Sequence, residues 1–229
     1  ETTSSFTSLT INGEIPIKAA IKKESNETNL VVVIEGDGRA WLDRHTPSND
    51  PTPKNGFGEK IALGIHASSV LYLSRPCQFL SDKEREVCTV LDWTDGRFSQ
   101  KLLLLTDSAI TKVKTENGFK KIVLVGYSGG GTMAMLLGTI RDDVEQIITV
   151  ASPLDTTAWT NFHNISPLKN SLNPADEKEK LFSIKQRHFI GTKDSVVPIN
   201  LTKDFVSTYP KNADVKVIEL QDLRHDMKG

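Results

Sequence analysis

The sequence predicts an α/β fold in which helices cover both faces of a mostly parallel sheet. Short, continuous apolar runs, which are typical of fully buried strands, alternate along the chain with segments whose apolar residues recur at helical spacing. Near the N-terminus, Asn12-Gly13 separates two apolar runs, and this dipeptide indicates an antiparallel hairpin. The 229 residues are enough for one such domain, and we expect a single domain over 1–229.

Each apolar run rich in β-branched residues predicts a strand. The hairpin strands are expected over 6–11 and 15–21, and buried strands over 30–34, 69–73, 122–125, 146–150, 187–190 and 214–220. Helical spacing predicts helices over 58–67, 97–114, 132–137 and 201–209. The polar residues 1–5 are expected to be loosely held, and the Pro-, Asn- and Asp-rich residues 43–58 predict a long loop. Residues 151–185 lack a clear period and predict a small irregular cap or lid segment.

The composition excludes several classes of partner. A formal charge of −1 gives no reason to expect nucleic acid or an anionic membrane surface. No apolar run approaches the roughly 20 residues that a transmembrane helix needs. The chain begins at Glu1 rather than Met, so we expect that an upstream segment was removed and that any signal peptide or lipid anchor lay within it.

The most informative motif is Gly126-Tyr127-Ser128-Gly129-Gly130, which follows a predicted buried strand and precedes a predicted helix. This strand–turn–helix context is what the nucleophile-elbow pattern requires. A plain flexible turn is the alternative for the five residues taken alone. In this context Ser128 is the candidate nucleophile.

An acid and a base are expected later in the chain, in that order. Asp194 follows the strand that ends at Ile190 and can orient a histidine there, although an aspartate at such a turn can also be a simple cap. His225 is the histidine that lies beyond Asp194, so it is the candidate base. The other histidines precede Asp194, namely His45, His66, His163 and His188.

An oxyanion hole requires backbone N–H groups. We expect one from Gly129, directly after the nucleophile, and one from Asp37 in the Gly-rich turn after the strand over 30–34. A carboxylate pair formed by Glu35 and Asp37 for glycoside chemistry is a weaker alternative. The residues expected to line the substrate pocket are Gly38, Arg39, Trp41, His45, Tyr127 and Trp159. For Arg39, an ion pair with Asp43 at the surface is an equal alternative.

Two cysteines, Cys77 and Cys88, flank a polar segment. A disulfide between them would stabilise the fold by about 2–3 kcal/mol, but two separate buried thiols fit the spacing equally well. Two cysteines without nearby histidines offer too few ligands for a metal site.

Several longer segments together resemble a family of bacterial exported α/β-hydrolases, many of which are known only as hydrolases or lipoproteins. They are Glu35-Gly36-Asp37-Gly38-Arg39-Ala40-Trp41, Thr46-Pro47-Ser48-Asn49-Asp50-Pro51, Arg75-Pro76-Cys77-Gln78 and Gly126-Tyr127-Ser128-Gly129-Gly130-Gly131. The resemblance implies an α/β-hydrolase fold, a triad of Ser128, Asp194 and His225, a disulfide between Cys77 and Cys88, and an extracytoplasmic location, either periplasmic, surface-anchored or secreted. After His225 the chain departs from the family pattern, which often continues with cysteine and tryptophan.

These observations predict a serine hydrolase that cleaves a carboxylic ester or thioester of a small acyl substrate through an acyl-enzyme, without a metal or organic cofactor. The same residues would also serve a peptidase, an amidase or an acyltransferase. From a different class, the chain could be a catalytically silent binding module on a hydrolase scaffold.

Overall fold

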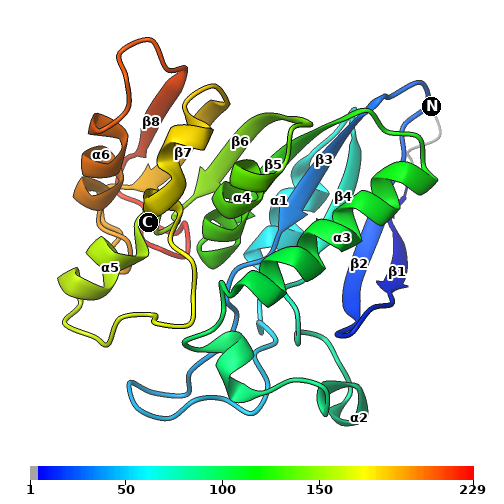
Figure 1. Cartoon of the computed structure of the whole chain (residues 1–229), viewed down its shortest axis with the longest axis horizontal. Helices are drawn as coiled ribbons and strands as arrows, with labels where there is room; N and C mark the ends of the chain where they lie inside the picture. Colours follow the sequence, from blue (N-terminus) through cyan, green and yellow to red (C-terminus); the bar gives the residue numbers. More distant parts are fainter. Residues whose placement is uncertain (1–4) are drawn as a thin grey trace.

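One eight-stranded sheet runs through the computed structural model, which describes residues 5–229 (Figure 1). The strands are β1 (Thr7–Ile11), β2 (Ile17–Lys22), β3 (Asn29–Ile34), β4 (Ser69–Leu73), β5 (Lys121–Tyr127), β6 (Val144–Val150), β7 (Lys185–Gly191) and β8 (Val215–Leu220). Their order in the sheet is β1-β2-β4-β3-β5-β6-β7-β8. β2 runs antiparallel to both of its neighbours, and all other pairs are parallel. The predicted mostly parallel sheet with an N-terminal hairpin is confirmed, whereas the prediction for residues 1–4 lies outside the described residues.

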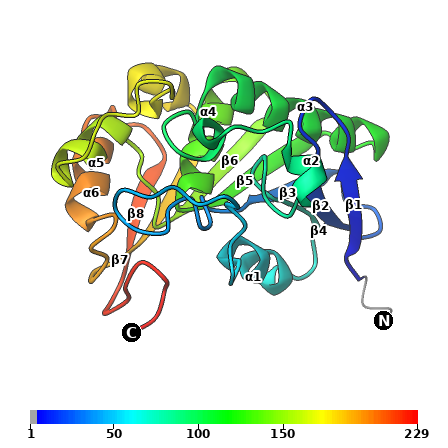
Figure 2. The same cartoon turned by 90° about the horizontal axis from the view of Figure 1, so that it is seen from below.

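Helices cover both faces of this sheet. They are α1 (Phe57–Gly64), α2 (Asp82–Arg85), α3 (Gln100–Glu116), α4 (Gly129–Ile140), α5 (Thr156–Phe162) and α6 (Ile199–Ser207), together with the 3₁₀ helices η1 (Val90–Trp93) and η2 (Pro174–Leu181). Figure 2 shows α3 and α4 on one face and α1 on the other. Because both faces are covered, central-strand residues such as Leu30, Val32 and Leu124 have no exposed surface, which accounts for the continuous apolar runs in the sequence.

Element ends differ from the predictions for local reasons. The pairing of Ile11 with Ile17 places residues 12–16 in the hairpin loop, since Pro16 has no N–H for a ladder hydrogen bond. Helix α1 ends at Gly64, and Ala67 then adopts a left-handed φ of 55° before β4 begins. Helix α3 begins at Gln100 because the side chain of Ser99 accepts a hydrogen bond from Leu102 N–H.

The carboxyl ends of the parallel strands meet at one edge of the sheet. Ile34 is level with Leu73 on one side and with Gly126 on the other. The long segments that follow β3 and β4 therefore lie side by side, below the sheet in Figure 1, and Trp93 Nε1 joins them by donating to the carbonyl of Ser48 over 3.0 Å. The sheet thus gathers several loops at the edge where ligands bind in such folds.

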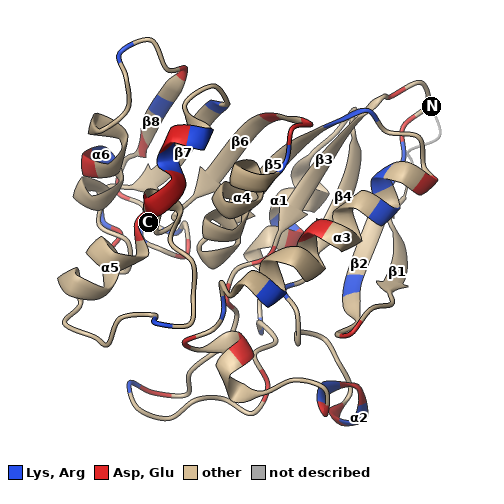
Figure 3. Cartoon of the chain, in the orientation of Figure 1, with Lys and Arg blue, Asp and Glu red and all other residues tan. Residues whose placement is uncertain are grey.

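Cys77 and Cys88 form a disulfide within the segment between β4 and α3. The carboxylate of Asp92 comes close to both sulfurs, but a disulfide sulfur is not the thiolate that a metal site requires. Among the described helices, none has the length and apolar character to cross a bilayer. Acidic and basic residues are interspersed over the elements, and α2 carries both (Figure 3).

Candidate active site

Ser128 lies at the sharp bend between β5 and α4. Its backbone angles are φ 49° and ψ −123°, a conformation that costs a residue with a side chain roughly 1–3 kcal/mol. The flanking glycines make the bend possible, because a Cβ on Gly126 would lie 2.3 Å from the backbone of Gly130. The lack of a side chain at Gly126 therefore lets the backbone of β5 and of α4 approach closely at the bend.

The side chains of Ser128, His225 and Asp194 come together beside this bend. Oγ of Ser128 lies 3.1 Å from Nε2 of His225, and Nδ1 of His225 lies 2.9 Å from Oδ2 of Asp194. A carboxylate oxygen only accepts hydrogen bonds, so Nδ1 carries the proton and donates it to Asp194. Nε2 is then the nitrogen that can accept the hydroxyl proton of Ser128, which is the geometry of a Ser-His-Asp triad.

Asp194 is held by the turn that follows β7. Its side chain has no exposed surface. Its Oδ1 accepts hydrogen bonds from the backbone N–H groups of Val196, over 2.9 Å, and Val197, over 2.8 Å. The second oxygen faces His225. The capping role and the histidine-orienting role considered for Asp194 are thus filled by different oxygens of the same carboxylate.

Tyr127 positions the segment that carries His225. Its hydroxyl donates to the backbone carbonyl of His225 over 3.1 Å, and the two rings lie 5.6 Å apart between centroids. Burial, together with the nearby carboxylates of Asp194, Asp226 and Glu35, raises the pKa of Tyr127 to about 12. The hydroxyl therefore stays protonated and remains a donor at neutral pH. This contact adds a positioning role to a residue that the sequence suggested only as pocket lining.

The two residues expected to supply the oxyanion-hole amides, Asp37 and Gly129, are in contact. The Asp37 carboxylate packs directly against the first turn of α4, since a Cβ on Gly129 would lie 1.9 Å from Asp37 Oδ1. Within residues 5–229, neither the Asp37 amide nor the Gly129 amide has an acceptor inside the chain. Both N–H groups therefore remain able to bind a substrate oxygen.

Two buried arginines hold the Asp37 side chain. Nη1 of Arg75 lies 2.8 Å from Oδ1, and Nη1 of Arg97 lies 2.8 Å from Oδ2. Burial alone would raise the pKa of Asp37, but the guanidinium groups of Arg97 and Arg75 outweigh it and hold the pKa below its usual value. The three side chains together carry a net charge of +1 beside the oxyanion loop.

Gln78 holds the backbone of the same loop. Its Nε2 donates to the carbonyl of Gly36 over 2.9 Å, and its Oε1 accepts from the Arg75 N–H over 3.1 Å. Sequence reasoning missed the roles of Arg75, Gln78 and Arg97. A signal existed for the first two, because Arg75-Pro76-Cys77-Gln78 follows the strand that pairs with β3 and so lies next to the turn at Asp37.

The Glu35 carboxylate has a structural role, because its hydrogen bonds are made within the protein. It is 1% exposed. Its oxygens accept from the N–H groups of Gly36, Gly58 and Glu59 and from the hydroxyl of Tyr72, over 2.9–3.1 Å. The carboxylate thereby anchors the start of α1. With Asp37 held by two arginines as well, these contacts argue against the glycosidase alternative, which required Glu35 and Asp37 to act on substrate as a pair.

Ser128 lines an inner pocket and a histidine-side hollow, and an outer groove adjoins the inner pocket. The inner pocket, about 230 Å³, contains Ser128, Gly38, Trp41 and Trp159, with Ala40, Phe98, Pro153 and Val197 as apolar lining. The histidine-side hollow, about 470 Å³, contains Ser128, His225, Tyr127, Arg39 and Lys54. The outer groove, about 780 Å³, continues from Trp41 and Trp159 to His45 and Arg44.

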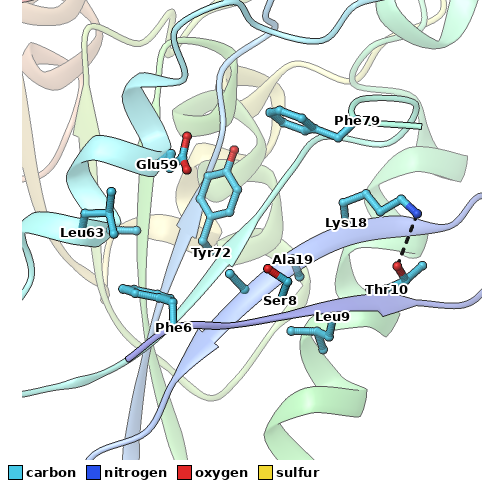
Figure 4. Close-up of a pocket in the computed structure, with 12 residues that line it drawn as sticks. Phe6, Ser8, Leu9, Thr10, Lys18, Ala19, Glu59, Leu63, Tyr72 and Phe79 are labelled. Atoms are coloured by element: carbon cyan, nitrogen blue, oxygen red, sulfur yellow. Dashed lines mark hydrogen bonds between the residues drawn. The ribbon is translucent and has the colours of Figure 1, made fainter. Parts of the chain in front are cut away.

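A separate hollow of about 520 Å³ lies between β1, β2 and α1 (Figure 4). The rings of Phe6, Tyr72 and Phe79 line it, and Lys18 Nζ donates to Thr10 Oγ1 at its side. None of the predicted site residues lines this hollow. The chemistry of the chain is therefore concentrated at the carboxyl edge of the sheet, around Ser128.

Solved structures with the same fold include several hydrolases. Est1E from Butyrivibrio proteoclasticus is 14% identical, aligns over 97% of this chain and 91% of its own, and has a TM-score of 0.68. The esterase Pf2001 from Pyrococcus furiosus is 13% identical over 98% of this chain and 84% of its own, with a TM-score of 0.68. The acylaminoacyl peptidase of Pyrococcus horikoshii is 13% identical, with a TM-score of 0.71 over 98% of this chain and 38% of its own.

At these identities the likeness shows the fold, and it confirms the expected α/β-hydrolase architecture. No curated protein sequence matches the chain. The expected membership of a bacterial exported family stays a prediction. Residues 82–227, which include Ser128, Asp194 and His225, match the family described as PGAP1-like alpha/beta domain. Since this match spans more than half of the 229 residues, the chain belongs to the PGAP1-like alpha/beta domain family.

Proposed function

We propose that the protein is a serine hydrolase that cleaves a carboxylic ester or thioester. The observation that carries the proposal is the chain of two contacts from Ser128 Oγ through His225 to Asp194, over 3.1 and 2.9 Å. Esterases and a peptidase among the proteins of similar fold support hydrolysis as the reaction type. A catalytically silent module would have no need to keep these three groups in register.

In the proposed mechanism Ser128 Oγ attacks the carbonyl carbon while His225 Nε2 takes the hydroxyl proton. The carbonyl oxygen becomes an oxyanion, which the N–H groups of Asp37 and Gly129 stabilise. His225 then returns the proton to the leaving oxygen or sulfur as its bond to carbon breaks, which leaves an acyl-enzyme. Water repeats the sequence with the same groups and releases the acid.

The hollows favour an ester with a short acyl group. The inner pocket is lined mainly by apolar side chains, with Asp37, Arg97 and Thr156 as polar lining, and its volume of about 230 Å³ is below the roughly 300–1,000 Å³ of sites for drug-sized ligands. A longer acyl chain would pass between Trp41 and Trp159 into the outer groove. In this reading the segment over 151–185, which supplies Pro153 and Trp159, is a cap that forms one wall of the pocket.

The disulfide between Cys77 and Cys88 favours an oxidising compartment. We therefore propose that the protein works outside the cytoplasm.

Fluorophosphonate labelling tests the nucleophile. Wild type is expected to form a covalent adduct on Ser128, and Ser128→Ala is expected to abolish it. Ser195→Ala is the matched control, because Ser195 is an exposed serine next to Asp194, and this variant is expected to be labelled as wild type. Equal labelling of Ser128→Ala and wild type would contradict the proposal.

Substrate class is then tested with p-nitrophenyl esters of increasing acyl length and with aminoacyl p-nitroanilides. Short esters are expected to be hydrolysed fastest. Faster turnover of the anilides would instead assign a peptidase or amidase.

A further inference from the structure

The position of His225 distinguishes the two sides of the site. In the proposed reaction, which this inference rests on, His225 must deliver a proton to the departing oxygen or sulfur, so the leaving group has to lie on the side of the imidazole. His225 lines the histidine-side hollow and does not line the inner pocket. The acyl group therefore occupies the inner pocket, and the leaving group occupies the histidine-side hollow.

Two cations without partners line the histidine-side hollow. Arg39 and Lys54 are both exposed and both face this space. Within the described chain, neither side chain has an ion pair or a hydrogen bond, and the alternative pairing of Arg39 with Asp43 is not present. Asp43 instead accepts from the N–H groups of His45 and Thr46.

Most arginines of the chain are engaged elsewhere. Those with a side-chain partner are Arg75, Arg85, Arg97, Arg141, Arg187 and Arg224. In the part of the chain that the structure describes, the arginines that remain are Arg39 and Arg44, which line the histidine-side hollow and the outer groove. The two arginines without a side-chain partner thus line hollows at or next to the site, and Arg39 is the one whose hollow also contains Ser128.

The acidic groups in the same hollow do not offset these cations. Glu35 is buried and accepts four hydrogen bonds within the protein. Asp37 is paired with two arginines, so that cluster is itself positive. The rings of Phe57 and Tyr127 also line this hollow, with their centroids 4.8 Å apart and their planes tilted by 46°. The hollow therefore combines two unpaired cations with aromatic lining.

We propose that the histidine-side hollow binds a leaving group that carries an anionic substituent, and that Arg39 and Lys54 recognise this charge. The substrate class is then an ester or thioester of a short acyl group with a phosphorylated, sulfonated or carboxylated alcohol or thiol. Arg39 suits an oxyanion because its guanidinium can donate two parallel hydrogen bonds, and Lys54 adds a mobile point charge.

The test compares two butyrate esters that share an acyl group and differ in leaving-group charge. One releases 4-hydroxybenzenesulfonate, which is anionic, and the other releases 4-hydroxybenzenesulfonamide, which is neutral and of similar size. The measured quantity is the ratio of kcat/KM for the anionic ester to that for the neutral ester. The difference in intrinsic reactivity between the two esters is the same for wild type and every variant. A change in the ratio between variants therefore reports recognition of the leaving-group charge.

The double variant Arg39→Gln/Lys54→Gln is expected to lower this ratio about tenfold, and Arg39→Lys is expected to retain most of it. Raising NaCl should lower the wild-type ratio in the same direction, because exposed charges are screened. Lys60→Gln, a change of an exposed lysine on α1 outside the hollow, is the control and should leave the ratio unchanged.

An unchanged ratio in the double variant, with both esters turned over by wild type, would overturn this inference and leave the proposed hydrolase intact. A wild type that neither hydrolyses the esters nor labels at Ser128 would overturn both.

Discussion

Asp37→Asn tests whether the charge of the Asp37 carboxylate, rather than its shape, holds the oxyanion loop. In the native protein each carboxylate oxygen receives one guanidinium group over 2.8 Å, from Arg75 and Arg97. Asparagine keeps the size of the side chain but removes the negative charge. Two buried guanidinium groups then face each other without a counter-charge.

The structure sets the size of the effect. Removing one partner of a fully buried ion pair costs about 3–5 kcal/mol. Because the Asp37 side chain is 23% exposed, solvent screening lowers the cost of removing its charge. We therefore expect a loss of about 2–4 kcal/mol in the free energy of unfolding. For a chain of this size, a loss of 3 kcal/mol corresponds to a fall of roughly 6–12 °C in Tm. Displacing an oxyanion donor should also lower kcat about 100-fold.

Calorimetry and ester kinetics measure the two effects separately. KM is expected to change by less than kcat, since the loop stabilises the transition state more than the bound ester. Asp82→Asn is a matched control, because Asp82 also pairs with an arginine but is fully exposed, and its Tm and kcat should stay at wild-type values. If Asp37→Asn keeps the wild-type Tm and kcat, the charge of this carboxylate does not organise the loop.

Three further predictions follow from contacts described above. Gly129→Ala should abolish activity and destabilise the fold, because its Cβ would meet Asp37 Oδ1 at 1.9 Å. Gly64→Ala is the control, since a Cβ there would have nothing within 4 Å, and it should be neutral or slightly stabilising. Comparable Tm values for the two variants would contradict this prediction. Replacing both Cys77 and Cys88 by serine should lower the free energy of unfolding by about 2–3 kcal/mol in urea titrations, and an unchanged midpoint would show that the disulfide adds nothing. Burial, and then the charge of Arg187, lowers the pKa of His188 to about 3. In the unfolded chain His188 is protonated below about pH 6.5, whereas in the folded chain it stays neutral down to its lowered pKa. The free energy of unfolding should therefore fall as the pH drops from 6.5 towards 3, by up to about 1.4 kcal/mol per pH unit from this group. His188→Gln should flatten that slope in urea titrations between pH 4 and 7, and parallel slopes for the two proteins would refute the assignment.

The sheet was predictable from the sequence because its strands carry strong local signals. The β-branched run at Leu30–Ile34 and the turn at Ser128 each indicate a buried strand and its end without reference to the rest of the chain. Element ends were less predictable, since they depend on single contacts, such as the cap that Ser99 places on α3. The pairing of Cys77 with Cys88 could be weighed from spacing but not decided, because spacing says nothing of whether two sulfurs meet.

The candidate site was predictable where chain order constrains it and unpredictable where contacts between distant segments build it. Ser128, Asp194 and His225 follow from a fixed order of roles along the chain. Arg97 belongs to no motif, and it reaches Asp37 only because the segment before α3 folds against the loop after β3. Its contribution is a long-range contact, and local sequence patterns do not predict such contacts.

The left-handed backbone of Ser128 has a consequence for engineering the protein. Glycine tolerates φ 49°, ψ −123° without the strain that any L-residue suffers there. Relief of roughly 1–3 kcal/mol should exceed the roughly 0.4–1 kcal/mol of extra chain entropy that glycine brings to the unfolded state. Ser128→Gly is therefore expected to melt at a higher temperature than Ser128→Ala, although both lack the hydroxyl. A selection for heat resistance alone would then favour substitutions such as Ser128→Gly that remove activity. Any thermostabilisation of this protein therefore has to be screened for turnover at every round.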